Sequence, residues 1–386
     1  MRFLSVVGAR PNFMKVAPLC REFRRVPAVE HILIHTGQHY DQQMSRSFFR
    51  DLELPSPDIN LEVGSGTHAW QTAEVMQRLE PVLLEKAPDL LIVVGDVNST
   101  LAASLTAAKL HIPIAHIEAG LRSFDREMPE EINRQLTDAI SQLLFVTEES
   151  GRRNLLREGV PADRVFLVGN VMIDCLLRYR EVAARSAILR DLSLLGNDNS
   201  VRPFALLTLH RPSNVDHSDT LEDILGAVLQ LAEQLPVFFP VHPRTRNRIE
   251  ALGYASRFQG PSQRNGNGLR FLEPLGYLEF LALMDRARLV LTDSGGVQEE
   301  TTALGVPCLT LRNNTERPAT VEQGSNQLVG MDTQLILTAA GQVLRGGFRS
   351  DRRPPLWDGH TAERIVEVLA KQFQLDLVPE AGAVRG

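Results

Sequence analysis

The sequence predicts an α/β protein of two Rossmann-like domains, whose parallel sheets face a central cleft. Three observations predict this fold class. Short apolar runs alternate with amphipathic stretches, a polar segment interrupts this alternation near the middle, and 386 residues are too many for one hydrophobic core. The alternation favours mostly parallel sheets covered by helices on both faces. Ligands of such sheets bind at the carboxyl ends of the strands.

The first half of the chain supplies six predicted strands separated by helical stretches. Apolar runs of four to six residues indicate the strands, and longer amphipathic stretches indicate helices. The strands are Phe3–Val7, Glu30–His35, Leu90–Val94, Ile114–Ile117, Leu143–Val146 and Val165–Val168, and the helices include Met14–Phe23, Thr72–Glu85, Thr100–Leu110 and Glu130–Ser141.

The second half repeats the pattern. We expect a first domain over residues 1–177, a linker region over 178–203, and a second domain over 204–361. The pattern leaves open whether the last helix and the tail, residues 362–386, pack back onto the first domain. The strands are Phe204–Leu209, Val237–Val241, Leu269–Leu272, Leu289–Thr292 and Pro307–Leu311, and the helices are Leu221–Gln234, Arg244–Leu252, Leu278–Asp285 and Ala362–Gln374. Residues 260–268 are expected to form a surface loop, and residues 378–386 a disordered tail.

Composition narrows the class of function. The net charge of −6 provides no basic excess for nucleic acid, and no apolar run approaches the length of a membrane span. The three cysteines, Cys20, Cys175 and Cys308, lack the spacing of a zinc site or a disulfide framework, so buried reduced thiols are expected. The protein is therefore expected to be cytoplasmic, without a metal site, and to bind neither nucleic acid nor membrane.

The segment Asp293–Glu300 carries the most specific local signal. It follows the predicted strand Leu289–Thr292, and its Ser294, Gly295 and Gly296 form a turn with little side-chain bulk before a helix over Gln298–Leu304. The free N–H groups of a helix N-terminus bind anions, so this turn predicts a diphosphate site. Glu299 and Glu300 would lie near a ribose, and Gly305 would end the helix.

Polar residues also follow the predicted strands of the first half. Arg10 and Lys15 flank a helix start and are candidates for holding phosphate; the alternative is a solvated basic pair. Asp96 and Glu118 follow neighbouring strands, and Glu130 and Glu131 open a helix, so together they form a candidate acid/base cluster. Each acid taken singly also fits helix capping or the helix dipole.

His116 alternates with Ile117 and Glu118, so His116 and Glu118 would share one face if the strand continues. We interpret His116 as a buried, hydrogen-bonded residue. In the second half, His210 and His242 leave predicted strands without metal-ligand spacing. Arg312 and Arg317 follow the strand after the diphosphate turn and are candidates for closing on the phosphates; the alternative is a loop ion pair.

Taken together, these blocks resemble the bacterial non-hydrolysing UDP-N-acetylglucosamine 2-epimerases over nearly the whole chain. The resemblance is specific because many short motifs occur in the same order. They are Gly8-Ala9-Arg10-Pro11, His35-Thr36-Gly37-Gln38-His39, Gly95-Asp96-Val97-Asn98-Ser99-Thr100, His116–Arg122, Pro129–Arg134, Val168-Gly169-Asn170, Asp293–Glu300 and Thr315-Glu316-Arg317-Pro318.

The resemblance implies a glycosyltransferase-B type architecture and an isomerase. Members interconvert UDP-N-acetylglucosamine and UDP-N-acetylmannosamine at C2, with neither metal nor nicotinamide as cofactor. Loss of UDP from C1 gives oxocarbenium character that acidifies C2, which explains why several carboxylates are needed. A homodimer serving the synthesis of cell-surface polysaccharide is expected.

The resemblance also assigns site residues. The catalytic candidates are Asp96, Glu118, Glu130, Glu131, His210 and Lys15. The UDP-sugar-binding candidates are Arg10, Lys15, Arg134, His242, Phe280, Ser294, Gly295, Gly296, Glu300 and Arg317, with Glu300 on the ribose.

Two departures from the family pattern leave the sugar and its regulation open. His210-Arg211-Pro212-Ser213 stands where many members have His-Arg-Arg-Glu. Ser65 and Gly66 replace an Arg-Gln pair that helps hold a second, activating substrate molecule. The alternatives are an epimerase of a UDP-2,3-diacetamido-uronic acid, a hydrolysing relative, a glycosyltransferase of the same architecture, and a nucleotide-sugar sensor without turnover.

Overall fold

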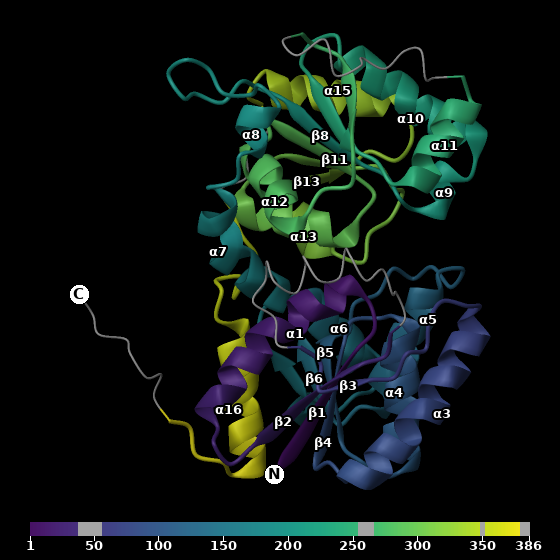
Figure 1. The fold of residues 1–386 in the computed structure, drawn as a ribbon, viewed down its shortest axis with the longest axis vertical. Helices are drawn as coiled ribbons and strands as arrows, with labels where there is room; N and C mark the ends of the chain where they lie inside the picture. Colours follow the sequence, from purple (N-terminus) through teal and green to yellow (C-terminus); the bar gives the residue numbers. More distant parts are fainter. Residues whose placement is uncertain (38–55, 254–265, 348–351, 379–386) are drawn as a thin grey trace. The chain divides into compact units, whose positions relative to one another are not determined.

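The computed structural model describes residues 1–37, 56–253, 266–347 and 352–378. The chain divides into two compact units, Met1–Cys175 with Pro355–Gly386, and Leu176–Pro354 (Figure 1). The sequence predicts domain boundaries after residues 177, 203 and 361, whereas the structure divides the chain after residues 175 and 354. The C-terminal segment thus belongs to the first unit.

The first unit is built on a parallel sheet. Within the described residues it has seven strands in the order β3-β2-β1-β4-β5-β6-β7. The strands are β1 (Arg2–Val7), β2 (Glu30–His35), β3 (Ile59–Asn60), β4 (Leu90–Val94), β5 (Ile114–Ala119), β6 (Leu143–Val146) and β7 (Val165–Leu167). The helices are α1 (Arg10–Glu22), η1 (Phe23–Arg25), α3 (His68–Lys86), α4 (Asn98–Lys109), α5 (Pro129–Ile140), α6 (Glu149–Arg157), η2 (Ala162–Arg164), α7 (Val171–Ala183), which runs into the second unit, and α16 (Thr361–Phe373).

Alternation along β1 shows how helices cover both faces of this sheet. Leu4 and Val6 belong to one core cluster, which includes buried residues of α3 and α4. Phe3 points to the opposite face, where its ring lies 5.9 Å from that of Phe23 and 5.0 Å from that of Phe373 in α16. Figure 1 shows α1 and α16 on one side of the sheet and α3 and α4 on the other.

The C-terminal helix α16 is fixed to the first unit by polar and apolar contacts. The Ala362 N–H donates to Asp174 Oδ2 at 2.7 Å, and the Trp357 indole N–H donates to the Thr147 carbonyl at 3.0 Å. Ile365 and Leu369 of α16 are buried. The first unit therefore needs both ends of the described chain to complete its core.

The second unit repeats the parallel design. Its described strands form a six-stranded sheet in the order β10-β9-β8-β11-β12-β13. The strands are β8 (Ala205–Thr208), β9 (Val237–Pro240), β10 (Leu269–Leu272), β11 (Leu289–Thr292), β12 (Cys308–Thr310) and β13 (Asn326–Leu328). The helices are α8 (Ile188–Asp191), α9 (Pro212–Val215), α10 (Ser218–Leu231), α11 (Pro243–Ala251), α12 (Tyr277–Arg286), α13 (Gly295–Leu304), α14 (Pro318–Glu322) and α15 (Thr333–Leu344).

The two parallel-sheet α/β domains expected from the sequence are confirmed. Sequence patterns did not predict β3, β13, η1, η2, α6, α7, α8, α9, α14 or α15. The two strands are only two and three residues long and lie at sheet edges, so they carry almost no periodicity. Helix α7 continues to Ala183, inside the segment expected to be a linker.

The cysteines and the helices can be compared with the expectations from composition. All three cysteines are buried, as expected, and none of them forms a disulfide. Among the described residues, no helix combines the length and apolarity needed to cross a membrane. The expected loop at residues 260–265 and the expected tail at 379–386 lie outside the described residues, as does the stretch from Gln38 to Asp41 of the His35 motif.

Candidate active site

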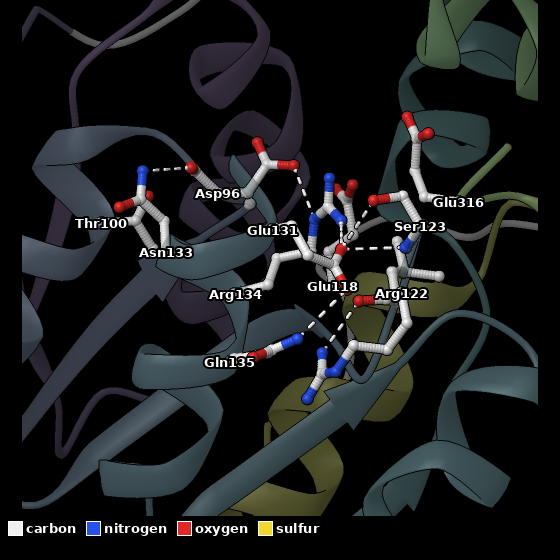
Figure 2. A network of polar contacts seen from close by, with 12 residues as sticks. Asp96, Thr100, Glu118, Arg122, Ser123, Glu131, Asn133, Arg134, Gln135 and Glu316 are labelled. Atoms are coloured by element: carbon white, nitrogen blue, oxygen red, sulfur yellow. Dashed lines mark hydrogen bonds and ion pairs between the residues drawn. The ribbon is translucent and has the colours of Figure 1, made fainter. Parts of the chain in front are cut away.

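Asp96 lies just beyond the carboxyl end of β4, where its side chain remains 23% exposed. Its Oδ2 accepts a hydrogen bond from Arg134 Nε at 3.0 Å, and its backbone carbonyl accepts from the Asn133 amide at 2.9 Å. Both donors come from α5, and Figure 2 shows their contacts with Asp96. Asp96 is thus held in place by its neighbours yet stays accessible from outside.

Glu118 occupies an unusual backbone position near the end of β5. Its φ of 74° lies in the left-handed region, and the pairing of β5 with β6 shifts between Ile117 and Ala119. Strand β5 does continue to Ala119, as the expectation that Glu118 shares a face with His116 required, but this irregularity interrupts the regular alternation at Glu118. Non-glycine residues held there cost about 1–3 kcal/mol, and such strain concentrates at functional sites.

The Glu118 carboxylate is buried and forms an ion pair with Lys15 Nζ from α1. Gly95 permits the approach of Lys15, because a Cβ at this position would lie 3.0 Å from Lys15 Nζ. The φ of Gly95, 69°, also favours glycine. The carboxyl ends of β1, β4 and β5 thereby bring together Lys15, Asp96 and Glu118.

Glu131 differs from the other acids because protein donors surround it. It is completely buried and accepts from the backbone N–H groups of Ser123 at 2.8 Å and Phe124 at 3.2 Å. The Ser123 hydroxyl donates at 3.0 Å and Arg134 Nη1 at 2.6 Å. Figure 2 shows Glu131 at the centre of this network. Its neighbour Glu130, by contrast, is half-buried.

His116 is a buried, hydrogen-bonded residue, as expected. It is fully buried, with Nδ1 2.7 Å from Asp138 Oδ1 and Nε2 2.8 Å from the Gly95 carbonyl oxygen. Burial alone raises the pKa of Asp138, but His116 and Arg122 outweigh it, so the pKa lies below its usual value. This chain of contacts fixes the backbone next to Asp96.

In the second unit, the turn after β11 has the expected strand-turn-helix form. Ser294 is the N-cap of α13, and the helix begins at Gly295 rather than at the expected Gln298. Gly305 ends it with a φ of 72°. Gly295 and Gly296 thus stand in the first helical turn, where backbone N–H groups lack intrahelical acceptors and bind anions.

The two acids of α13 have different partners. The Glu299 carboxylate forms an ion pair with Arg317 Nε at 2.6 Å. Glu300 is buried and accepts a hydrogen bond from the Tyr277 hydroxyl at 3.1 Å, and burial raises its pKa to about 7. Glu299 is therefore committed to holding Arg317, whereas Glu300 remains the better candidate for a ribose.

Arg312 and Arg317 lie in a dense group of charges. Arg312 Nη2 is 2.8 Å from Glu316 Oε2. Burial acts to raise the pKa of Glu316, but Arg317 and Arg312 hold it well below its ordinary value. A Cβ on Gly295 would lie 2.7 Å from Glu316 Oε1, so this charge group packs directly against the first turn of α13.

The remaining second-unit candidates lie around the ends of the strands. His210 follows β8, its side chain is 59% exposed, and its Nδ1 lies 2.8 Å from Asp293 Oδ1. His242 is exposed after β9, and Phe280 is half-buried in α12. Arg10 begins α1, but its side chain lies outside the part of the chain that the structure describes.

Some residues in these networks escaped the sequence analysis. Asn133, Asp138, Tyr277 and Asp293 hold the candidate residues in place, yet no role was assigned to them. Asn133 and Asp293 occur inside motifs that were noticed, whereas Asp138 and Tyr277 carry no local signal, because their partners are distant in sequence.

Among the described residues, no group of three or more His, Cys, Asp or Glu side chains is arranged to hold a metal ion.

The family profile of the UDP-N-acetylglucosamine 2-epimerases matches residues 21–370. The chain belongs to the UDP-N-acetylglucosamine 2-epimerase family.

Individual relatives of this epimerase cover nearly its whole length. The UDP-N-acetylglucosamine 2-epimerase of Methanocaldococcus jannaschii is 42% identical over 373 residues, covering 96% of this chain and 99% of that protein. The UDP-2,3-diacetamido-2,3-dideoxy-D-glucuronate 2-epimerase of Pseudomonas aeruginosa is 40% identical, covering 96% of this chain and 100% of that protein.

Solved structures agree with the family assignment. The crystal structure of the M. jannaschii UDP-GlcNAc 2-epimerase in complex with UDP-GlcNAc and UDP matches with a TM-score of 0.86 and 41% identity. The match covers 96% of this epimerase and 100% of that chain. Both the resemblance read from the motifs and the expectation of an isomerase are confirmed.

Proposed function

We propose that this epimerase interconverts UDP-N-acetylglucosamine and UDP-N-acetylmannosamine at C2 without releasing free sugar. The observation that carries the proposal is the strained Glu118, ion-paired with Lys15 and placed in one site with the accessible Asp96. Two carboxylates in unlike environments are what acid/base chemistry on two faces of a sugar requires.

The reaction begins with cleavage of the bond between C1 and the diphosphate oxygen, whose electron pair leaves with UDP. The resulting positive character at C1 acidifies the C2 hydrogen, which a carboxylate removes to give 2-acetamidoglucal. A proton then returns to the opposite face of C2, and UDP adds back to C1. Asp96 and Glu118 are the proposed bases, with Glu130 as a third candidate.

Glu131 is proposed to act differently, as a positioning residue. Its carboxylate is fully buried and surrounded by donors from Ser123, Phe124 and Arg134. It orients Arg134, which in turn holds Asp96.

The second unit is proposed to bind UDP. The first turn of α13 supplies backbone donors for the diphosphate, and Glu300 receives the ribose hydroxyls. Lys15 and His210 would stabilise the diphosphate as it leaves, since charge develops there in the transition state. The further proposed contacts are those of Arg10, Arg134, His242, Phe280 and Arg317.

Proton NMR in deuterated water tests the function directly. With UDP-N-acetylglucosamine as substrate, a UDP-N-acetylmannosamine signal should grow, and deuterium should enter C2 of both sugars. Asp96→Asn should reduce turnover at least about 1,000-fold while UDP still binds, because a base is lost. Glu127→Gln, an exposed acid in the neighbouring loop, serves as the matched control. Accumulation of free N-acetylmannosamine would instead indicate a hydrolase.

A second candidate substrate is a UDP-2,3-diacetamido-uronic acid, because one relative at 40% identity carries that activity in its name. The same deuterium experiment with both sugars distinguishes them. The substrate with the larger kcat/KM identifies the reaction, and exchange with neither sugar contradicts both proposals.

We also propose a cytoplasmic homodimer. Trp70, Ile132 and Leu136 on α3 and α5 are 41–46% exposed, and Ile132 lines an apolar hollow of about 400 Å³ that Met76 also borders. Apolar surface of this kind supports association. Sedimentation should show a dimer that Ile132→Glu with Leu136→Glu converts to monomers. The three buried cysteines, none of which forms a disulfide, support a reducing compartment.

A further inference from the structure

Asp293 is a buried carboxylate that the proposed reaction does not use. It follows β11 and immediately precedes Ser294, the N-cap of α13. Its side chain is fully buried, whereas the side chain of its partner His210 is 59% exposed. Because β8 and β11 are neighbours in register, with Thr208 opposite Thr292, the residues that follow the two strands meet.

The donors around Asp293 divide unequally between its two oxygens. Oδ2 accepts from the backbone N–H groups of His210 at 3.0 Å and Arg211 at 2.9 Å, and from the Asn214 amide at 3.2 Å. Oδ1 lies 2.8 Å from His210 Nδ1 and also receives the His210 N–H at 3.2 Å. One oxygen therefore holds the backbone, and the other faces the imidazole.

We propose that Asp293 is a positioning residue that acts through His210. It keeps a proton on Nδ1 and turns the Nε2 edge outward, so that a charged N–H meets the diphosphate bound at the first turn of α13. This inference rests on the proposed UDP site and adds a residue to it. It follows the general rule that the group bonded to one imidazole nitrogen determines what the other nitrogen can do.

Electrostatics supports the arrangement. An isolated carboxylate beside a helix N-terminus would repel a bound diphosphate. Burial alone raises the pKa of Asp293, but the imidazole and backbone donors outweigh it, so the pKa is lowered and the carboxylate is ionised. A protonated His210 ring neutralises the negative charge of the Asp293 carboxylate, and its Nε2–H carries positive charge on the exposed side of the ring. The pair thus presents a cation where the leaving group gains charge.

Other charged groups around the pair do not replace this function. Arg211 Nε donates to the Asp293 carbonyl oxygen at 3.2 Å, and its Nη2 lies 3.6 Å from Glu316 Oε1. Glu316 is also bound by Arg312 at 2.8 Å. The Arg211 and Arg312 guanidiniums are thus engaged with Glu316, whereas His210 offers an exposed polar edge.

Nitrogen-15 NMR of the histidine ring tests the pair without any sugar. In wild-type protein saturated with UDP, both ring nitrogens of His210 should carry protons. In Asp293→Asn, the three donors at Oδ2 will retain the amide oxygen there, which places the amide NH2 against Nδ1. That nitrogen must then become an acceptor, and the signals should indicate a neutral ring protonated at Nε2. An unprotonated Nδ1 in the wild type overturns the proposal, whatever the variants do.

Kinetics provides a second readout. Asp293→Asn should lower kcat about 10- to 100-fold, because a neutral donor replaces a charged one, while KM for the UDP-sugar, whose diphosphate has not yet gained the charge of a leaving group, changes less than about threefold. Adding Asp293→Asn to His210→Asn should cost little further activity, since Asp293 acts through the ring. Asp219→Asn and His217→Asn, at exposed positions of the same unit, serve as controls. A rise in KM for the UDP-sugar equal to the loss of kcat, or full additivity, would show a merely structural role.

Failure of the proposed function is distinguishable from failure of this inference. An inactive wild-type enzyme that nevertheless shows the doubly protonated ring with UDP rejects the sugar assignment and keeps the pair. An active enzyme in which Asp293→Asn retains full kcat rejects the pair and keeps the epimerase.

Discussion

At the scale of single residues, neighbouring carboxylates acquire different roles from their surroundings. Asp96 is partly exposed and paired with Arg134, Glu118 is buried against Lys15, and Glu131 is enclosed by donors. Carboxylates with the same intrinsic chemistry can serve either as a base or as a positioning residue, because their solvation and hydrogen bonds differ.

Glu131→Gln should lower the free energy of unfolding of the first unit by about 3 kcal/mol, because the buried Arg134 would keep Asp96 at Nε but lose the charged partner of its Nη1. Urea denaturation measures this change. Glu127→Gln, in the exposed part of the same loop, should have almost no effect. Unchanged stability together with a complete loss of turnover would show that Glu131 acts on the substrate itself.

Glu300 gives a prediction about pH. Because burial raises its pKa to about 7, its contribution to stability is complete below the ordinary value near 4.5 and is lost as pH rises through 7. In the variant Glu300→Gln, the side chain cannot ionise. The free energy of unfolding of this variant, relative to that of the wild type, should therefore rise by as much as about 3 kcal/mol between pH 5 and pH 8.

Urea denaturation of the nucleotide-free protein at both pH values measures this gain. The exposed Glu322→Gln is the control, and its difference from the wild type should be the same at pH 5 and pH 8. A constant difference for Glu300→Gln would mean that Glu300 titrates normally.

At the scale of elements, the site depends on where helices begin. Helix α13 starts at Gly295, three residues before the expected start, so its first turn is free of side-chain bulk. Helix α5 places Asn133 and Arg134 against the loop after β4. Close packing at the first turn of α13 and between α5 and the loop after β4, rather than sequence periodicity, determines where the hydrogen-bond donors of these two helices point.

Gly295→Ala should weaken UDP binding at least about 10-fold, because the added Cβ would lie 2.7 Å from Glu316 Oε1, and Glu316 is itself held by Arg312. Titration calorimetry with UDP measures the loss. Gly226→Ala in α10 is the matched control, because nothing lies within 4 Å of its added Cβ. Equal UDP affinity in the two variants would remove the first turn of α13 from the binding site.

At the scale of the whole molecule, each unit has its own sheet and core, and the first unit is completed by a helix from the far end of the sequence. Leu369 of α16 is 1% exposed, whereas Leu84 of α3 is 64% exposed. Stability of the first unit therefore depends on residues more than 180 positions from its other elements.

Leu369→Ala should destabilise the first unit by about 2–5 kcal/mol through loss of buried surface and creation of a cavity, while the second unit is unaffected. Calorimetric scanning should show one transition lowered, and UDP should raise the transition of the second unit. Leu84→Ala should leave both transitions in place. An equal shift of both transitions by Leu369→Ala would show that the units unfold together.

The sequence by itself determined the α/β class, most strands, the helix N-terminus after β11 and the family, because apolar periodicity and ordered motifs are local properties of the chain. It also identified Asp96 and Glu118 as candidates. Only the tertiary structure decided that Glu131 is enclosed, that Glu118 sits on left-handed backbone, and that Asp293 holds His210. These facts depend on contacts between residues far apart in sequence, which no local pattern records.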